Sequence, residues 1–433
     1  MGRSRNGRWL TGVGLMLILL AGISASIAWS IPVFSRKYQT SCSTCHYAFP
    51  QLNAFGKAFQ ANGYRYPGGD ANFRKEDPVS LGSESYKKVW PNAIWPSDIP
   101  GTSPFAVHAV GSIEMPFNQP DSVAKSIISF PQHVQVFYTG ALGERFSIFG
   151  EVEIEDDAGT AAVGFPFRFS YNQAPAFNVT VGSLHFDPTP GDFGLIPQEY
   201  NVSALPSRYG WTAGGEQPGI GAWGAGNGSG GKGGWKYSTG VVEGQGMGGL
   251  GADKDVFARA SYKIGGLGEI GGTEGQASTS SAFYQDNSAT IGGYIYSGKV
   301  AGDGTTTFYA DREDLTAYAG TADLWYKGAI LNATVFNMTS KIDGRGLPER
   351  KSLAWYVQGQ YVIYPWLIGL TRYEATDEDT GDNVDAATTL IPAVVGMVRA
   401  NVKLTLEYRR PMSDYSTRKV DEEHLLLRLN FAL

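Results

Sequence analysis

The chain has 433 residues, of which 42% are hydrophobic and 18% are charged, and it contains 57 Gly, 23 Tyr and 22 Phe. Low charge and many aromatic residues exclude an intrinsically disordered chain, which would be rich in charge and poor in aromatic residues. The formal net charge of −6 argues against a nucleic-acid partner, which needs a basic surface.

The N-terminal segment has the pattern of an export signal. Three arginines within the first eight residues precede an apolar run at residues 10–27, and Ser26-Ile27-Ala28 supplies small residues for cleavage. We expect residues 1–28 to be a signal peptide; the alternative is a retained transmembrane anchor. After Ala28, no segment reaches the roughly 20 continuous apolar residues of a helical span, so any later membrane insertion must use strands.

The two cysteines of the chain belong to the sequence Cys42-Ser43-Thr44-Cys45-His46. Two thiols three positions apart, followed by an imidazole, suit two thioether bonds to a haem and axial ligation of its iron by His46. A zinc site needs about four ligands and there is no second cysteine pair. A redox-active dithiol of the thioredoxin type would lie in a βαβ pattern, which is absent. The motif therefore predicts one covalently bound haem c.

Residues 29–66 are predicted to form a small α-helical haem domain. Pro50 can open a helix, and Gly63 can end it. Apolar side chains share one face of this helix at spacings of three and four: Leu52, Phe55 and Phe59. We expect this face to lie against the porphyrin; alternatively it is only the core of the small domain. About 40 residues bury too little surface to be stable alone, so a larger structure must cover them.

The sequence around the cysteine motif resembles that of a known protein family. The matching stretches are Pro32-Val33-Phe34-Ser35-Arg36-Lys37-Tyr38, the cysteine motif, Phe49-Pro50-Gln51-Leu52-Asn53-Ala54-Phe55-Gly56, and Gly63-Tyr64. Over about 40 residues they resemble the outer-membrane cytochrome–porin fusion family of iron-oxidising bacteria, whose members are taken to oxidise extracellular Fe(II). Related monohaem–barrel fusions also occur in organisms that do not oxidise iron, so the resemblance of this N-terminal segment does not by itself identify the substrate.

From residue 105 onward the chain alternates apolar and polar residues in segments of about ten, as outer-membrane strands do. Residues 105–117, 353–363, 401–408 and 424–431 are the clearest segments. A soluble β-sandwich gives the same alternation. Tight connections such as Lys327-Gly328, flanked by aromatic residues, alternate with long ones such as residues 187–234, and this asymmetry favours a membrane barrel.

The predicted fold is an all-β transmembrane β-barrel of about 16 antiparallel strands at residues 105–433. The small haem domain is expected to plug its lumen, and residues 67–104 are expected to be the linker. We place the strand starts near residues 105, 131, 145, 165, 176, 235, 254, 275, 289, 315, 329, 353, 366, 387, 400 and 422.

The second axial ligand of the iron cannot be a His or Met of the head or linker, because neither residue occurs between Tyr47 and Val107. Three barrel histidines have the parity of lumen-facing positions: His108 near the periplasmic end, and His133 and His424 toward the outer end. We expect one of them to ligate or closely approach the iron, first His133 and then His108. The alternatives are an open site, a weaker ligand such as Tyr or Lys, or histidines that only line the lumen. Met115 and His185 have the lipid-facing parity.

These features predict one-electron transfer across the outer membrane. The resemblance implies Fe(II) as the donor and a periplasmic cytochrome or other carrier as the acceptor. The alternatives are export of electrons to an external acceptor, and a porin or transporter with a haem-containing plug. Acidic stretches are expected in the external loops, at residues 156–157, 311–314, 377–385 and 421–423. They would concentrate cations at the mouth, or else bind divalent ions that bridge lipopolysaccharide.

Overall fold

The computed structural model describes residues 33–75, 79–80, 98–99, 104–117, 126–142, 145–157, 160–185, 189, 195–197, 200–207, 216–244, 254–271, 283–301, 312–342, 349–381, 387–412 and 423–432. The predicted signal peptide at residues 1–28 and most of the predicted linker lie outside these ranges. No helix among these residues is both long enough and apolar enough to cross a membrane.

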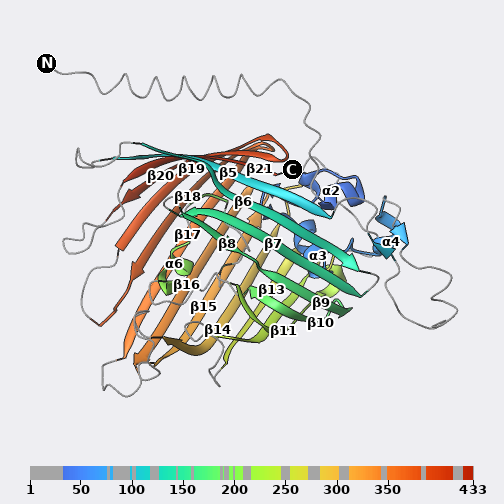
Figure 1. Ribbon diagram of the computed structural model, residues 1–433, viewed down its shortest axis with the longest axis horizontal. Helices are drawn as coiled ribbons and strands as arrows, with labels where there is room; N and C mark the ends of the chain where they lie inside the picture. Colours follow the sequence, from blue (N-terminus) through green and yellow to red (C-terminus); the bar gives the residue numbers. More distant parts are fainter. Residues whose placement is uncertain are drawn as a thin grey trace.

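A closed antiparallel barrel makes up most of the molecule (Figure 1). Its strands are β5 (Phe105–Pro116), β6 (Ile127–Leu142), β7 (Phe146–Asp157), β8 (Thr160–Gly164), β9 (Phe167–Ala174), β10 (Phe177–His185), β11 (Glu216–Asn227), β12 (Lys232–Val242), β13 (Asp255–Leu267), β14 (Ser288–Ala301), β15 (Arg312–Tyr326), β16 (Ala329–Ile342), β17 (Arg350–Tyr364), β18 (Leu367–Asp377), β19 (Ala387–Arg399), β20 (Val402–Pro411) and β21 (His424–Ala432). Each strand pairs with the next, except that β8 and β9 both pair with β7, and β21 pairs with β5 to close the barrel.

The seventeen segments amount to sixteen strands, because β8 and β9 are two parts of one strand. Both pair with β7, and Phe165 and Pro166 separate them. Proline lacks the N–H that a continuous ladder requires, so the pairing is interrupted there. The prediction of a closed barrel of about sixteen antiparallel strands is confirmed.

Two predicted strand positions are wrong, and their errors cancel in the count. Residues 187–234 were expected to be one long connection, but they contain β11. The glycines of β11 hide its alternation, since only Ile220 and Trp223 are large apolar residues there. The strand expected near residue 275 falls mainly outside the described residues, and β13 pairs directly with β14, which leaves no place for a strand between them.

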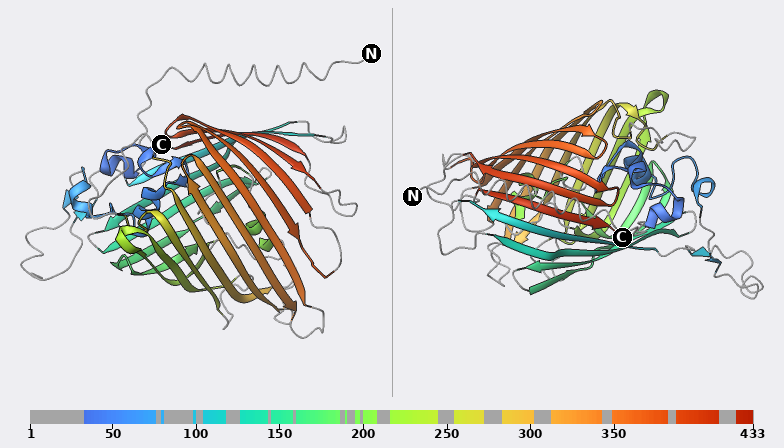
Figure 2. Two further views of the ribbon diagram at one scale, coloured as in Figure 1. Left: turned by 180° about the vertical axis from the view of Figure 1, so that it is seen from behind. Right: turned by 90° about the horizontal axis from the view of Figure 1, so that it is seen from above.

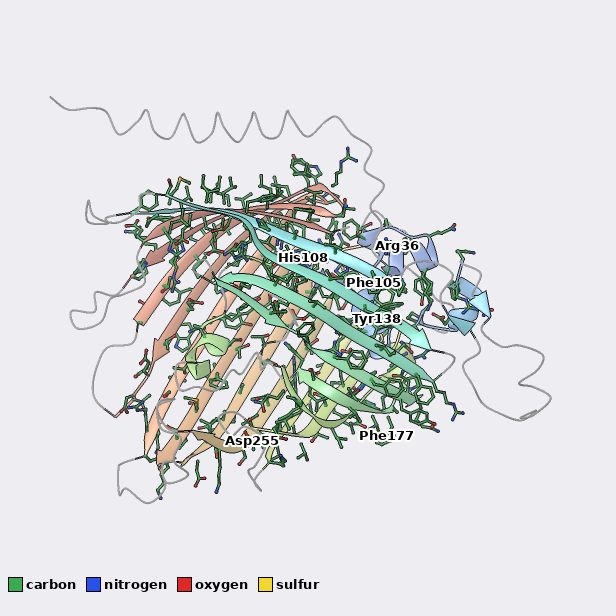
Figure 3. All side chains as sticks on the ribbon, viewed as in Figure 1. Arg36, Phe105, His108, Tyr138, Phe177 and Asp255 are labelled. Carbon is green, nitrogen blue, oxygen red and sulfur yellow. The ribbon has the colours of Figure 1, made fainter. Side chains whose placement is uncertain are left out.

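The outer face of the barrel is apolar, as a membrane requires. Ile220, Ile291 and Tyr361 are each about 60% exposed, although they are large hydrophobic residues. Phe105, Tyr138 and Phe177 lie at the end of the barrel where the head is seated (Figure 3). Tyr326, Tyr364 and Trp366 flank the tight turns at this same end, which matches the aromatic girdle of an outer-membrane barrel. Such closed barrels with an apolar belt are proteins of the outer membrane, in contact with its lipid.

The N-terminal head lies at the end of the barrel that also holds the C-terminus and most of the tight turns (Figure 2). Its elements are α2 (Val33–Tyr38), the short 3₁₀ turn η1 (Cys42–Thr44), β1 (His46–Ala48), β2 (Gln51–Leu52), α3 (Ala54–Ala61) and α4 (Asp70–Phe73). The packed head continues beyond residue 66, because Asp70 pairs with Lys37 at 3.3 Å and the N–H of Lys75 donates to the carbonyl of Lys37. A two-residue pairing of β3 (Val79–Ser80) with β4 (Asp98–Ile99) follows.

The connection between β10 and β11 folds into the lumen. It carries the helix α6 (Asn201–Ser207), which is drawn inside the barrel in Figure 1. Leu195, Val202 and Leu205 have no exposed surface. The Nδ2 of Asn201 donates to the carbonyl of Ala375 at 2.7 Å, and this bond ties α6 to the wall. The lumen is therefore partly filled by the head at one end and by α6 in its interior.

Candidate functional site

The cysteine motif lies in a tight turn that opens onto the barrel lumen. Cys42 begins η1, and the N–H of Cys45 donates to the carbonyl of Cys42 at 3.1 Å. His46 follows at once and begins β1, which pairs with β2. Cys42, Cys45 and His46 all line one cavity, so the local fold gives the three side chains a common space.

Asn53 holds the motif against the following helix. Its side chain is buried, and the Nδ2 donates to the carbonyls of Ser43 and Thr44, both at 3.1 Å. Its Oδ1 accepts from the N–H of Gly56 at 2.9 Å and so caps α3. The helix expected to open at Pro50 therefore begins at Ala54, and Pro50 lies in the turn between β1 and β2 instead.

Two glycines fit the head for steric reasons. A Cβ at Gly56 would lie 2.1 Å from the carbonyl oxygen of Cys45, so only glycine lets α3 approach the motif this closely. Gly63 follows the end of α3 with a φ of +68°, the left-handed conformation of a helix C-terminus. The predicted stop at Gly63 is confirmed, whereas the need for Gly56 was not recognised from the sequence.

The His46 ring is oriented by the main chain. Its Nδ1 lies 2.9 Å from the carbonyl oxygen of Pro50, so Nδ1 carries the proton and donates, and Nε2 keeps its lone pair. Burial lowers the pKa of His46 to about 4, against the opposing effect of the backbone contacts at Pro50 and Gln51. A neutral imidazole with one nitrogen fixed by a carbonyl is the usual arrangement of a metal-ligating histidine.

Both cysteines are free thiols. Burial raises the pKa of Cys45 to about 12, with a smaller contribution from Cys42, and burial also raises the pKa of Cys42. The two side chains therefore remain protonated thiols at neutral pH. They lack the thiolate character that a redox-active dithiol uses.

The predicted apolar face is divided between the cavity and the core of the head. Leu52 and Phe59 line the cavity, as expected. Phe55 is 3% exposed and packs within the head, with its ring centroid 5.0 Å from that of Tyr66. Phe59 also contacts Tyr38, at 5.7 Å between ring centroids. The three residues do not form one helical face, because Leu52 lies in β2.

The cavity occupies about 1260 Å³ between the head and one side of the barrel. This volume exceeds the roughly 300–1,000 Å³ of ordinary small-molecule pockets. Aromatic side chains of the head border it, together with charged and polar side chains of the wall. The charged wall residues are Glu151, Glu153, Lys236, Arg168, Arg259, Lys403 and Arg428.

His108 is the barrel histidine that lies closest to the motif through described contacts. The Phe49 ring lies between them, 5.5 Å from His46 and 5.3 Å from His108 between ring centroids. The Nδ1 of His108 lies 2.8 Å from the Oε1 of Gln135, and its Nε2 lies 3.3 Å from the Nδ2 of Asn430. Because the Gln135 oxygen can only accept, Nδ1 donates there and Nε2 keeps its lone pair, as in His46.

The other histidines have different surroundings. His133 also lines the cavity, 6.5 Å from His108 between ring centroids, but its Nε2 lies 2.6 Å from the Oε1 of Glu153. His424 is opposite Pro116 at the outer end, 3.9 Å from Glu114, and it does not line the cavity. His185, expected to face lipid, borders the cavity at the end of β10.

The head is fixed to the opposite side of the barrel by buried polar contacts. The Nζ of Lys57 lies 2.9 Å from the Oδ2 of Asp323, and 4.8 Å from the centroid of the Trp325 ring. Tyr47 packs edge-on against Trp325 at 5.2 Å, and its hydroxyl donates to Gln360 at 3.0 Å. These contacts join residues far apart in the sequence, so no sequence pattern predicted them.

The acidic stretches expected in the external loops are only partly described. Asp377 ends β18, and Asp379 lies 3.9 Å from Arg350. Asp314 in β15 lies 3.7 Å from Lys299, whereas residues 311, 382–385, 421 and 422 lie outside the described residues. Within the described part of the chain, no three His, Cys, Asp or Glu side chains come together in a way that would hold a metal ion.

The side chains around the cavity fit a covalently bound haem. The two protonated thiols and the oriented imidazole are the groups that attach and ligate a haem c, and all three line one space. Aromatic side chains of the head supply apolar surface beside them. The second imidazole with a fixed tautomer, that of His108, borders the same space.

Comparison with known proteins gives a likeness of fold. No protein-family model and no curated protein matches the chain. Among solved structures, an anion-selective porin from Comamonas acidovorans is 12% identical, with a TM-score of 0.53, and the match covers 76% of this chain and 98% of that one. OmpF of Salmonella typhi, in complex with daunomycin, is also 12% identical, with a TM-score of 0.52 over 76% of this chain and 97% of its own. The outer membrane channel DcaP of Acinetobacter baumannii is 12% identical, with a TM-score of 0.50 over 76% and 96%. The chain therefore has the barrel fold of porins.

Proposed function

We propose that this chain is an outer-membrane electron-transfer protein that carries one haem c in the barrel lumen and oxidises Fe(II) at the cell exterior. The observation that carries the proposal is the position of the cysteine motif, whose two thiols and imidazole border the cavity of a membrane barrel. A redox group held there lies between the two sides of the membrane. It can therefore link an external donor with a periplasmic carrier.

Each residue of the motif has a separate role in this proposal. The thiols of Cys42 and Cys45 would hold the haem through two thioether bonds, each formed by addition of an S–H across a vinyl group with no atom lost. His46 would offer its Nε2 to the iron, since the carbonyl of Pro50 accepts from its Nδ1 and orients the ring. The bound haem supplies a one-electron couple whose potential depends on axial ligands and surroundings.

We propose that His108 would hold the haem iron from the barrel wall. Its Nδ1–H donates to the Oε1 of Gln135, so its Nε2 carries a lone pair, and the 3.3 Å contact of Nε2 with the Asn430 amide would give way to the iron. The Nε2 of His133, in contrast, lies 2.6 Å from the carboxylate of Glu153. This reverses the order expected from the sequence, in which His133 came first. The wall contacts of Gln135 and Asn430 would orient the ring before any ligand binds.

In this proposal the barrel wall surrounds the redox group and insulates it. The head and the inward loop both pack against the side of the lumen formed by β15–β19, where Leu195, Tyr47 and Trp325 belong to one buried apolar cluster. This packing limits free diffusion through the lumen. The donor is assigned as Fe(II) on the sequence resemblance, and the acceptor as a periplasmic cytochrome or other carrier.

A second candidate is a porin or transporter whose head only plugs the channel. The porin fold and the large, partly charged cavity favour this function. In that case the cavity would hold solute rather than a redox group, and the motif would have no effect on transport.

The two candidates differ in whether electrons or ions cross the membrane. The test uses the full chain, produced in a bacterium with c-type cytochrome maturation and reconstituted into liposomes that enclose ferric cytochrome c. Wild-type protein should carry covalent haem and reduce the enclosed cytochrome when Fe(II) is added outside, and the Cys42→Ser/Cys45→Ser variant should not. Liposomes loaded with reduced cytochrome and given external ferric chelate test electron export. Ion flux without reduction, or wild-type protein without covalent haem, overturns the electron-transfer proposal in favour of the porin.

A further inference from the structure

Lys403 is a buried lysine beside the lumen cavity, and among the described residues no acidic side chain pairs with it. It is 4% exposed, it lies on β20 and it lines the cavity. Among the described residues, its hydrogen-bond acceptor is the carbonyl of Leu195, at 3.1 Å from Nζ. An ammonium group carries three donors, and a buried charge without a counter-charge is costly. The position therefore calls for an anionic group in the cavity.

A second cation lies on the neighbouring strand. In the register of β20 and β21, Lys403 is opposite Asn430 and Thr405 is opposite Arg428. Lys403 and Arg428 are thus diagonal neighbours, about 7–8 Å apart at the backbone. The Nε of Arg428 is buried without a hydrogen-bond partner, and its Nη2 reaches Gln132 only at 3.4 Å. Among the described residues, the carboxylates of Glu407 and Glu155 act electrostatically on Arg428, whereas the charged group that acts on Lys403 is Arg428 itself.

Two routes connect this cation pair with the head. Asn430, opposite Lys403, contacts the Nε2 of His108, which packs on Phe49. Leu195, the acceptor for Lys403, belongs to the same buried cluster as Tyr47. The pair is therefore one layer of residues away from the motif, on the side of the cavity where His108 lies.

We infer that Lys403, assisted by Arg428, binds a carboxylate group in the lumen cavity, and that in the haem-loaded protein this carboxylate is a propionate of the haem. The inference rests on the proposed function for the identity of the carboxylate. A small free carboxylate anion in the lumen offers the same chemistry, so the experiment has to separate the two sources. Two other cavity cations lie on different strands: Arg168 on β9 donates to Tyr64 at 3.0 Å, and Arg259 on β13 donates to the carbonyl of Thr189 at 2.6 Å. Lys403 and Arg428, in contrast, are neighbours on paired strands.

The test measures the midpoint potential of purified haem-loaded protein in the variants Lys403→Met, Lys403→Arg and Lys236→Met. A cation at a propionate favours the reduced haem, so its removal in Lys403→Met should lower the potential, by about a tenfold change in the redox equilibrium, or about 59 mV for one electron. Lys403→Arg should restore the potential because it keeps the charge. Lys236→Met is the matched control, since Lys236 lines the same cavity from β12. Covalent haem content and the heat-modifiable gel mobility of the barrel report folding in each variant.

The outcomes separate this inference from the proposed function. An unchanged midpoint potential in Lys403→Met with normal haem content overturns the propionate contact. An equal fall of the midpoint potential in Lys236→Met also overturns it, because the effect would then come from the summed charge of the lumen and not from a local contact. If wild-type protein holds no haem, the proposed function fails. The carboxylate site at Lys403 is then tested by measuring the acetate selectivity of the haem-free barrel in planar bilayers, with sodium acetate as the probe. There, a loss of acetate selectivity in Lys403→Met supports a site for a free carboxylate, and unchanged selectivity overturns the site altogether.

Discussion

The side chains that point into the lumen are packed differently on the two sides of the barrel. On β14–β19, inward side chains such as Tyr296, Phe336 and Tyr356 are almost completely buried, and they pack against one another and the inward loop. On β20–β21 and β5–β13, inward side chains such as His108 and Arg168 border the cavity. None of the described residues of β14–β19 lines the cavity.

This difference shows how a head of about 40 residues gains stability without losing room for a ligand. One side of the barrel supplies the apolar surface that so short a chain lacks. The other side keeps space beside the motif. Substitutions on the packed side should therefore change how firmly the head is held, and substitutions on the open side should change the chemistry of the cavity.

The largest effect is expected from Cys42→Ser/Cys45→Ser on the open side. Both thioether bonds are then impossible, so covalent haem should be lost completely, as measured by haem staining of denaturing gels. The barrel should still fold, because both thiols border the cavity, whereas the described residues of β14–β19 form the packed side of the lumen and do not line it. Retention of haem after denaturation would contradict the assignment of the motif.

A change of spin state is expected for His108→Ala, also on the open side. Loss of a second imidazole should convert low-spin ferric haem to high-spin haem, which absorption and electron paramagnetic resonance spectra detect. His424→Ala is the control, since His424 does not line the cavity. A low-spin spectrum that persists in both His108→Ala and His133→Ala would rule out ligation by either barrel histidine.

A moderate effect is expected for Lys57→Met on the packed side. Asp323 is 6% exposed and would lose its ionic partner, at a cost of about 1–3 kcal/mol in docking of the head. The lower end is expected because Trp325 and Asn332 still donate to Asp323. Limited proteolysis of the head and single-channel conductance should both increase, while covalent haem content stays the same.

The pH dependence of the same contact has a definite sign. Burial is the largest single influence and lowers the pKa of Lys57, but Asp323, with smaller contributions from Glu269 and Asp286, outweighs it, so the pKa of Lys57 is raised. The contact therefore stabilises docking fully below the ordinary lysine pKa of about 10.4 and weakens only as the pH rises through the higher folded value. Proteolysis of wild-type protein should be independent of pH from neutral to mildly alkaline conditions. The double variant Lys57→Met/Asp323→Asn should recover part of the loss, and a double variant no better than Lys57→Met would contradict the pairing.

The smallest effect is expected at the external rim, outside both sides of the lumen. Asp377→Asn/Asp379→Asn removes two negative charges and should raise the KM for Fe(II) roughly two- to five-fold at low salt. The difference should vanish at high salt, because screening shortens the range of exposed charges. Equal kinetics at low salt would show that these residues only remain hydrated or bind other ions.

Alternation and connection length were sufficient to predict the barrel, because lipid on one side and the lumen on the other impose a period of two. They failed at β11, where four of the twelve residues are glycine and only Ile220 and Trp223 are large apolar residues. The small head was predicted less well. Pro50 was a reasonable helix start by local preference, but the Asn53 side chain caps α3 three residues later and also binds the motif.

Parity correctly brought His108 and His133 into the lumen, but it could not rank them. Their order depends on whether Glu153 or Gln135 lies beside each ring, and this follows from the register of β6 and β7 rather than from spacing. The Lys57–Asp323 contact and the surroundings of Lys403 join segments hundreds of residues apart. A single sequence holds no signal for such pairs.

The position of the two thiols also constrains the order of assembly. Cys42 and Cys45 line a cavity inside a barrel that the pairing of β21 with β5 closes. An enzyme that attached a haem to these thiols, as we propose, would need access to an extended chain around the motif. On this proposal the attachment has to precede the pairing of β21 with β5, and the closed barrel would then surround the attached group.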